Sequence, residues 1–204
     1  MARKATRDML LTGYTRARRE MTLVSEASGK VMAVHYDMGN QVAQAAFVEL
    51  DTTFTRLDLQ NNAVNQKKEV SRIAYLEKET KRYRDLVSRS TAPQSTLDEL
   101  EQQLDQARLG LRELKVSRQR QSEKLSRHTI EAPVGWRVIK RLVEPGEWVN
   151  VGQQVAVLGD FQTLIAPFAL TPEEYAWLQA APQSIPLLLP GLLGGNVVQA
   201  TVYR

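Results

Sequence analysis

The feature that most constrains this chain is a short β-type pattern that occurs twice, once toward each end. The first copy runs from Gly29 to Asp51 ("GKVMAVHYDMGNQVAQAAFVELD") and the second from Gly135 to Asp160 ("GWRVIKRLVEPGEWVNVGQQVAVLGD"). Both place glycines, valines and other aliphatic residues in the same order, and the second copy carries one extra residue. A β unit that recurs across a long intervening segment predicts that the two copies are halves of a single module.

The two copies can be aligned position by position. The alignment pairs Gly29 with Gly135, Gly39 with Gly146, Val42 with Val149, Ala45 with Gly152, Val48 with Val155 and Leu50 with Val157. In "EPGE", Pro145 and Gly146 take the second and third positions of a type II turn, where a positive φ favours glycine. Gly39 has the same place in "DMGN". The predicted turn residues are therefore Gly29, Gly39, Gly135, Pro145, Gly146 and Gly152.

The segment between the copies is predicted to be helical. Neither Gly nor Pro occurs between Gly39 and Pro93, and the residues there are rich in Gln, Glu, Lys, Arg and Leu. Its second part has two heptad rows: Leu97, Leu104, Leu111, Arg118 and Leu125, and Leu100, Ala107, Leu114, Gln121 and His128. This spacing predicts a coiled-coil seam, which the polar steps Arg118 and Gln121 weaken.

The first part of the helical segment, from Thr53 to Val87, is less regular. Its apolar residues fall on two rows: Ile73, Leu76, Tyr83 and Val87 on one, and Leu57, Ala63, Val64 and Val70 on the other. A change of row indicates a helix with a stutter.

A polar loop, residues 88–96, separates the two helices. Ser95 or Thr96 is expected to cap the second helix, and Asp98 and Glu99 are expected in its first turn. Two helices joined by a short loop form an antiparallel hairpin, on the order of 50 Å long at a rise of 1.5 Å per residue.

Composition excludes several classes of function. The chain has no cysteine, so disulfides and thiolate chemistry are excluded, and its two histidines alone suggest no metal site. The net charge of +4 is scattered over a helical pattern without interleaved aromatics, so no nucleic acid partner is expected. No apolar run could span a membrane, and the N-terminus lacks a signal-peptide core. The Gly-rich run 191–195 lacks the lysine of a phosphate loop and is expected to form the turn of a β-hairpin. Since no nucleotide, metal or acid/base motif is found, no cofactor and no catalytic residue are predicted.

The order half-module, helical hairpin, half-module resembles the periplasmic adaptor proteins, or membrane fusion proteins of the HlyD type. The strongest stretch is "IEAPVGWRVIKRLVEPGEWVNVGQQVAVLGD", and "VSEASGKV" resembles the beginning of the family's first half. The resemblance implies an α+β fold, in which a split lipoyl-like, barrel-sandwich hybrid domain carries an inserted coiled-coil hairpin. An incomplete β-barrel domain would follow, so the sequence is expected to be a fragment.

The resemblance implies five segments along the chain. They are a strand from the β-barrel domain (1–23), the first lipoyl-like half (24–51), the hairpin (52–128, tip 88–96), the second half (129–160) and the partial barrel (161–204).

A shorter motif lies at the hairpin tip. In adaptors that meet a TolC-like outer-membrane channel, the tip reads Arg, three residues, Leu, six residues and Ser. Here "RYRDLVSRSTAP" supplies Arg82 and Leu86 at that spacing, but Pro93 takes the serine position. The hydroxyl would then come from another tip residue: Ser90, Thr91 or Ser95. The resemblance thus implies a partner-binding tip made of Arg82, Leu86, Pro93 and Ser95.

The function that the resemblance implies is a non-catalytic adaptor in a tripartite efflux pump. Its partners would be an inner-membrane transporter, of the resistance–nodulation–division class or alternatively an ABC transporter, and a TolC-like channel. Copies are expected to form a ring, with hexamers as the expected size. The protein would lie in the periplasm, attached to the inner membrane, with its export signal or anchor outside this sequence.

Two other functions fit parts of the pattern. A biotinyl or lipoyl carrier domain presents a modified lysine on a turn between its halves, but "ELDTTF" carries no lysine at that junction. A coiled-coil scaffold without a transport role would need the hairpin but not the β repeat.

Overall fold

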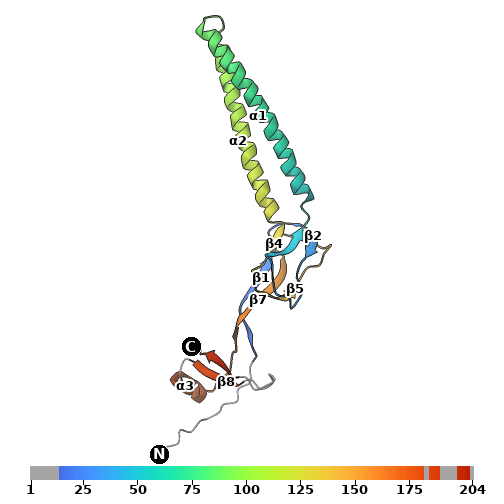
Figure 1. Ribbon diagram of the computed structural model, residues 1–204, viewed down its shortest axis with the longest axis vertical. Helices are drawn as coiled ribbons and strands as arrows, with labels where there is room; N and C mark the ends of the chain where they lie inside the picture. Colours follow the sequence, from blue (N-terminus) through green and yellow to red (C-terminus); the bar gives the residue numbers. More distant parts are fainter. Residues whose placement is uncertain (1–13, 182–183, 189–196, 203–204) are drawn as a thin grey trace, which may run out of the picture. The chain divides into compact units, whose positions relative to one another are not determined.

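The computed structural model describes residues 14–181, 184–188 and 197–202. One compact unit, Ala17–Thr163, contains two β-sheets and a long helical hairpin (Figure 1). The expected domain boundary at residue 160 falls inside a strand that runs on to Ile165, and the compact unit ends three residues later than expected. That strand continues because it pairs with the strand that begins at Arg16.

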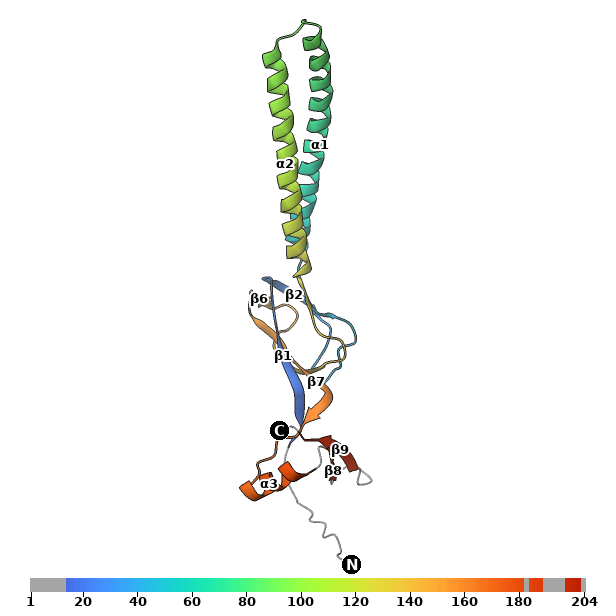
Figure 2. The same cartoon turned by 90° about the vertical axis from the view of Figure 1, so that its left-hand side faces the viewer.

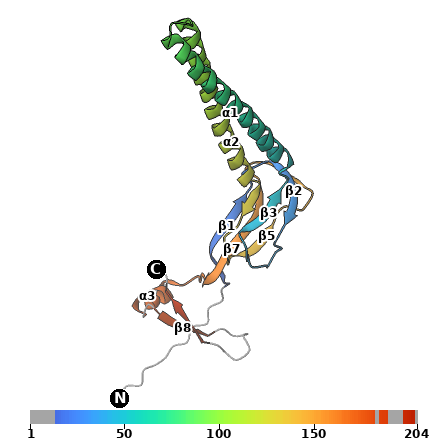
Figure 3. The ribbon, with the colours of Figure 1, turned by 45° about the horizontal axis from the view of Figure 1, so that its top comes forward.

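The strands of the compact unit form two sheets (Figure 3), and one of these sheets draws strands from both copies of the repeat. One sheet has the order β1-β7-β5 and the other β4-β3-β2-β6. The strands are β1 (Arg16–Val24), β2 (Gly29–Val34), β3 (Ala46–Leu50), β4 (Thr129–Glu131), β5 (Arg137–Arg141), β6 (Trp148–Val149) and β7 (Gln154–Ile165). Because β2 from the first copy pairs with β6 from the second, neither copy forms the four-stranded sheet alone.

Backbone hydrogen bonds pass between the copies in a matching pattern. The N–H of Val31 donates to the carbonyl of Glu147, and the N–H of Gly146 donates to the carbonyl of Val31, both at 2.8 Å. Val138 exchanges the same two bonds, both at 2.9 Å, with the turn that contains Gly39. Val31 and Val138 are therefore equivalent, and each half is completed by a turn of the other.

The expected equivalence of Gly29 and Gly135 is wrong by one residue. Gly29 pairs with Val149, whereas in the other copy the N–H of Val42 donates to the carbonyl of Trp136. With Trp136 in place of Gly135, the two copies align without an extra residue. Gly29 was also predicted to lie in a turn, but it is the first residue of strand β2 and does not have a positive φ.

The two turns that cross between the halves have the geometry that glycine favours. Gly146 has a φ of +96°, and the N–H of Glu147 donates to the carbonyl of Glu144 at 3.2 Å. Gly39 has a φ of +85°, a backbone conformation that residues with a Cβ rarely adopt. Positive φ also occurs at Gly135 and Gly152.

One hydrophobic core lies between the sheets and takes residues from both copies. Its fully buried members include three repeat pairs: Val31 and Val138, Val42 and Val149, and Val48 and Val155. Phe47 and Leu158, one from each copy, are the largest side chains that are fully buried. Burial of such side chains contributes about 1.5–3 kcal/mol each, so the module depends on both halves.

The hairpin consists of α1 (Thr53–Ser88) and α2 (Gln94–Ser126), which lie side by side along their length (Figure 2). On α2, the predicted seam is confirmed at Leu97, Leu104 and Ala107, which are buried, but Arg118 is exposed. Leu76 of α1 packs in the same cluster as Leu104 and Ala107. Burial of the Arg118 guanidinium between only two helices would cost too much hydration free energy, so its side chain is exposed to solvent.

The predicted stutter in α1 is wrong, because its inner face follows one unbroken heptad pattern. Residues at the inner positions recur three and four apart, and each is buried or half-buried: Thr55, Leu59, Asn62, Gln66, Glu69, Ile73, Leu76, Thr80, Tyr83 and Val87. Of the four residues that indicated a second row, Leu57, Val64 and Val70 are each more than half exposed, whereas Ala63 is half-buried. Polar residues therefore occupy seam positions, while apolar residues lie on the outer face.

The two connections between the β domain and the hairpin are tied together. The N–H of Leu50 donates to the carbonyl of His128 at 2.8 Å. The buried His128 ring donates its Nδ1–H to the carbonyl of Lys124 at the end of α2, at 2.8 Å. The carboxylate of Asp51 accepts from the Thr53 N–H (2.8 Å) and hydroxyl (2.6 Å), so it satisfies the first N–H of α1, although Thr52 is the N-cap residue. These hydrogen bonds from Thr53 lower the pKa of Asp51 below its ordinary value of 3.8.

The second unit contains α3 (Pro172–Ala180), β8 (Ser184–Leu188) and β9 (Val197–Thr201). Thr171 and Glu174 form a capping box at the start of α3, and β8 pairs antiparallel with β9. The expected turn at 191–195 lies outside the described residues. Among the helices described, none combines the length and the apolar character that crossing a membrane requires.

We expect Leu104→Ala to lower the free energy of unfolding by about 2–3 kcal/mol, the low end for a buried leucine, because a two-helix seam can partly collapse around the gap. Leu109→Ala is the matched control: it is on the same helix but 54% exposed, so about 0.5 kcal/mol or less is expected. Chemical denaturation followed by circular dichroism measures both, and equal effects would contradict the seam.

We expect Asp51→Ala to lower the melting temperature at neutral pH, with Asp58→Ala, an exposed aspartate within α1, as the control. Because folding lowers the pKa of Asp51, its contribution is present above pH 3.8 and is lost as the pH falls through the folded-state value. The difference from the unmodified protein should therefore shrink below pH 3.8. A difference that does not change with pH would show that Asp51 stabilises the start of α1 without its charge.

Candidate functional site

The tip of the hairpin is a tight loop, residues 89–93, held by the end of α1. The carbonyl of Leu86 accepts hydrogen bonds from the N–H groups of Arg89 (3.2 Å) and Thr91 (3.0 Å) and from the Thr91 hydroxyl (2.8 Å). Ser90 adopts a φ of +58°, the left-handed conformation that commonly follows a helix end. The loop is thus fixed by local backbone bonding.

The expected cap of the second helix is wrong. Pro93, not Ser95 or Thr96, precedes the first helical residue, and no side chain caps the helix. A proline is tolerated here because the first N–H groups of a helix have no partner within the helix, so its missing donor costs nothing. Asp98 consequently lies beyond the first turn, where its carboxylate accepts from the Gln94 side chain at 2.8 Å.

Arg82 lies on the outer surface of α1, two turns before the loop. Its side chain is 61% exposed and forms an ion pair with Glu79. Its guanidinium also lies over the ring of Tyr83, 5.4 Å from the centroid. These contacts orient the group along the helix, while the remaining donors of its planar fork stay available for a carbonyl or carboxylate of a partner.

Leu86 lies four residues after Arg82, so the two share one side of the helix. Leu86 is half-buried, so only part of its side chain is available as an apolar contact. Pro93 and Ser95 are both exposed, at the loop end and in the first turn of α2. The structure therefore places Arg82 and Leu86 in the last two turns of α1, Pro93 at the end of the loop and Ser95 in the first turn of α2.

The structure narrows the choice among the three hydroxyls that could replace the hydroxyl of the motif serine. Thr91 already donates its hydroxyl hydrogen to the Leu86 carbonyl. The hydroxyls of Ser90 and Ser95 are exposed and make no hydrogen bond to any residue that the structure describes. These two serines are the better donors for a partner.

Two cross-helix ion pairs below the tip were not predicted from the sequence. Arg84 pairs with Glu101 at 2.6 Å, and Arg108 pairs with Glu77 at 2.9 Å. The signal that could have found them is the charge at positions flanking the seam. Exposed pairs contribute about 0–1 kcal/mol each, so their main effect is to fix how α1 is aligned against α2.

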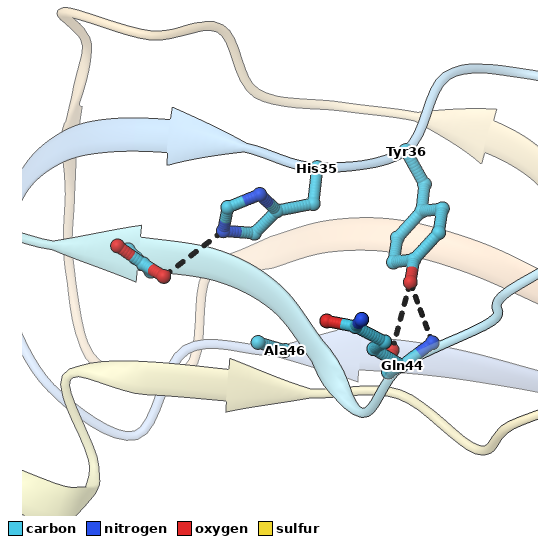
Figure 4. Close-up of a pocket in the computed structure, with 5 residues that line it drawn as sticks. His35, Tyr36, Gln44 and Ala46 are labelled. Atoms are coloured by element: carbon cyan, nitrogen blue, oxygen red, sulfur yellow. Dashed lines mark hydrogen bonds and ion pairs between the residues drawn. The ribbon is translucent and has the colours of Figure 1, made fainter.

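An open cavity of about 300 Å³ lies in the β domain between His35, Tyr36, Gln44, Ala46 and Glu49 (Figure 4). His35 Nε2 lies 3.0 Å from the Glu49 carboxylate. The Tyr36 hydroxyl donates to the Gln44 carbonyl (3.0 Å) and accepts from the Gln44 N–H (2.6 Å). The polar groups that line the cavity are thus hydrogen-bonded to one another, and they hold the segment between β2 and β3 in place. The cavity therefore has a structural role.

Comparison with solved structures identifies the class of fold. A structure described as an efflux transporter from Bacteroides eggerthii DSM 20697 is 16% identical with a TM-score of 0.60, over 97% of this chain and 59% of that chain. The periplasmic adaptor protein EmrA is 15% identical with a TM-score of 0.58, over 94% of this chain and 86% of its own. The membrane fusion protein Spr0693 from Streptococcus pneumoniae R6 is 14% identical with a TM-score of 0.61, over 82% of this chain and 71% of its own.

The chain has the fold of the membrane fusion proteins, the periplasmic adaptor class. It spans 59% of the length of the Bacteroides eggerthii protein and larger parts of the other two. No protein-family model matches the sequence, and no curated protein matches it either.

Proposed function

We propose that this chain is part of a non-catalytic periplasmic adaptor in an efflux pump. The observation that supports it best is the mechanical design of the compact unit: a β domain closed by both halves of the repeat carries a long hairpin with an exposed, locally fixed tip. Such a unit offers a contact surface far from its base, as a connector between two other proteins requires. The similarity in fold to adaptor proteins agrees with this proposal.

The finer parts of the proposal follow from the family resemblance. The β domain would be a split lipoyl-like, barrel-sandwich hybrid domain, and the second unit part of a β-barrel domain. Copies would form a ring of six around an inner-membrane transporter, of the resistance–nodulation–division class or alternatively an ABC transporter. The protein would lie in the periplasm, attached to the inner membrane.

The hairpin tip would bind a TolC-like outer-membrane channel. Arg82 would bond carbonyl or carboxylate oxygens of the channel, and Leu86 would supply a partly exposed apolar contact beside it. Ser90 or Ser95 would supply the hydroxyl that the motif serine gives elsewhere. Pro93 would shape the loop without contributing a donor.

The biotinyl or lipoyl carrier alternative needs a lysine on the turn between the halves. In this chain the halves are joined through the hairpin, and the connection at Asp51–Thr53 is an N-terminal helix cap without a lysine. The intact mass of the purified protein distinguishes the two functions, since a carrier domain would show the added mass of its prosthetic group.

We expect Arg82→Ala and Leu86→Asp in the full-length protein to abolish efflux, measured as drug susceptibility of a strain that lacks the unmodified copy. Lys115→Ala, an exposed cation in the basal half of α2, is the matched control and should retain efflux. Melting curves by circular dichroism should stay close to that of the unmodified protein, because neither tip residue belongs to the β core. Full efflux with both tip variants would show that the tip does not bind the channel.

A further inference from the structure

Gly110 is the only glycine in the two helices of the hairpin, and it lies in the interior of α2. Neither its backbone nor its surroundings require a glycine. It has no positive φ, and a Cβ at this position would meet only the carboxyl carbon of Glu69, at 4.0 Å, which is an ordinary contact. Glycine weakens a helix interior relative to alanine, because it loses more backbone entropy on folding. Helix α2 is therefore weakened at a point where packing would accept alanine.

Glu69 of α1 faces this weakened point of α2. One of its carboxylate oxygens, Oε2, is buried and has no hydrogen-bond partner among the residues that the structure describes. Thr80 and Gln121 also carry a buried oxygen of this kind, but only Glu69 has an atom within 4 Å of the Cβ position of Gly110. A buried polar oxygen without a partner is costly, because it has lost its hydrogen bonds to water. An opening at this level returns water to the Glu69 oxygen, which lowers the cost of opening.

The level of Glu69 and Gly110 lies just below the part of the seam that is joined most firmly. On the tip side of this level, Leu104 belongs to the apolar cluster between the helices. Arg108 and Glu77 form an ion pair across the helices on the same side, at 2.9 Å. The tip half of the hairpin is therefore held together by both apolar and ionic contacts.

The base side of this level is joined by a polar contact instead. The side chain of Gln66 donates to the carbonyl of Leu114 at 3.4 Å. Between this hydrogen bond and the ion pair on the tip side, no hydrogen bond or ion pair links residues 67–72 with residues 109–113, all of which the structure describes. The level of the glycine is thus a gap between two sets of contacts.

We propose that the hairpin has a hinge at this level: α2 opens reversibly at Gly110, and the tip half then bends as one body relative to the basal half. Helices bend sharply where water enters the ladder of backbone hydrogen bonds, and a glycine lowers the cost of such an opening. The contacts on either side keep each half closed while the hinge opens. A bend here would let the tip tilt without a change in the β domain. That use rests on the proposed function, whereas the opening itself does not.

A role in helix alignment is the alternative explanation for polar residues in the seam, since buried polar groups can fix the register of two helices. Gln66 makes a contact of that kind with Leu114. Such a role needs a hydrogen bond across the seam, which Oε2 of Glu69 lacks, and it does not need a glycine on the opposite helix. The hinge accounts for both features.

Amide hydrogen exchange of the 204-residue protein tests the hinge, because opening of a helix exposes N–H groups that bond to carbonyls four residues earlier. Opening at Gly110 exposes the amides of residues 110–114. The protection factor compares each measured exchange rate with the rate of an unfolded peptide of the same sequence. The protection factors of residues 110–114 should be about tenfold lower than those of residues 103–107 and residues 118–122.

Two substitutions, one on each helix, should close the hinge. Gly110→Ala should raise the protection of residues 110–114 about fivefold, the factor that the difference in helix propensity predicts, and should raise the melting temperature. Glu69→Leu should raise that protection by a similar factor, because it removes the buried oxygen without a partner. The matched controls are Ser122→Ala and Lys68→Leu, at exposed positions of α2 and α1, and both should leave that protection unchanged. Melting curves by circular dichroism should show that every variant is folded.

Equal protection along α2 would overturn the hinge, and so would a minimum at residues 110–114 that Gly110→Ala leaves unchanged. A minimum that responds to Gly110→Ala but not to Glu69→Leu would overturn the claim that water at Glu69 eases the opening. A minimum that both substitutions remove, and neither control affects, would support the hinge as proposed.

The use of the bend is tested separately, in the full-length protein. Gly110→Ala should reduce efflux although it raises the melting temperature, a combination that a merely structural role of the glycine would not produce. Full efflux with this variant would overturn the use of the bend but not the opening. The exchange result does not depend on whether Arg82→Ala and Leu86→Asp abolish efflux, so a failure of the hinge and a failure of the proposed function are distinguished.

Discussion

The rest of the compact unit depends on the exchange of backbone hydrogen bonds between the two halves of the repeat. Val31 bonds to the Gly146 turn and Val138 to the Gly39 turn, so neither half has a complete set of partners alone. An unpaired buried backbone group costs free energy comparable to a lost hydrogen bond, which makes closure of the module close to all-or-none. Closure also fixes the two ends of the hairpin beside each other, through the bond between Leu50 and His128.

This closure explains how the hairpin tolerates a polar seam. Thr55, Asn62 and Gln66 occupy inward positions near the base, where a coiled coil would normally place apolar residues. Among the described residues, buried side-chain oxygens of Glu69, Thr80 and Gln121 have no hydrogen-bond partner. Two helices held only by such a seam would separate. Here both helices are joined by the chain to the β domain, and the hydrogen bond between Leu50 and His128 holds the two connections together.

Much of the fold could be predicted from the sequence because its signals are local. The glycine turns at Gly39 and Gly146 need a positive φ, and the leucine rows of α2 keep a strict heptad, so both were predicted from spacing alone. Helix α3 carries the capping-box pattern of Thr171 and Glu174, a signal that was present but not used.

The register of α1 could not be predicted in the same way. Its apolar residues Leu57, Val64 and Val70 are on the outer face, so hydrophobicity indicated the wrong row. The shift between Gly29 and Gly135 shows the same limit: two glycines aligned by type, although one begins a strand and the other has a positive φ. The residues of the candidate tip could be predicted from the sequence. The start of α2 at Gln94 and the hydrogen bond from the Thr91 hydroxyl to the Leu86 carbonyl could not, because both depend on backbone geometry.

The distribution of apolar residues along the hairpin follows from where the chain is constrained. The apolar cluster of Leu76, Leu104 and Ala107 lies in the half nearer the tip, together with the ion pair between Arg84 and Glu101. The tip is far from the β domain, so only contacts between the helices hold it in shape. At the base, the β domain supplies that constraint, and polar side chains can occupy the seam there without the helices separating. The proposed contact of the tip with a channel would need a tip of fixed shape, and apolar contacts in the half of the hairpin nearer the loop supply that constraint.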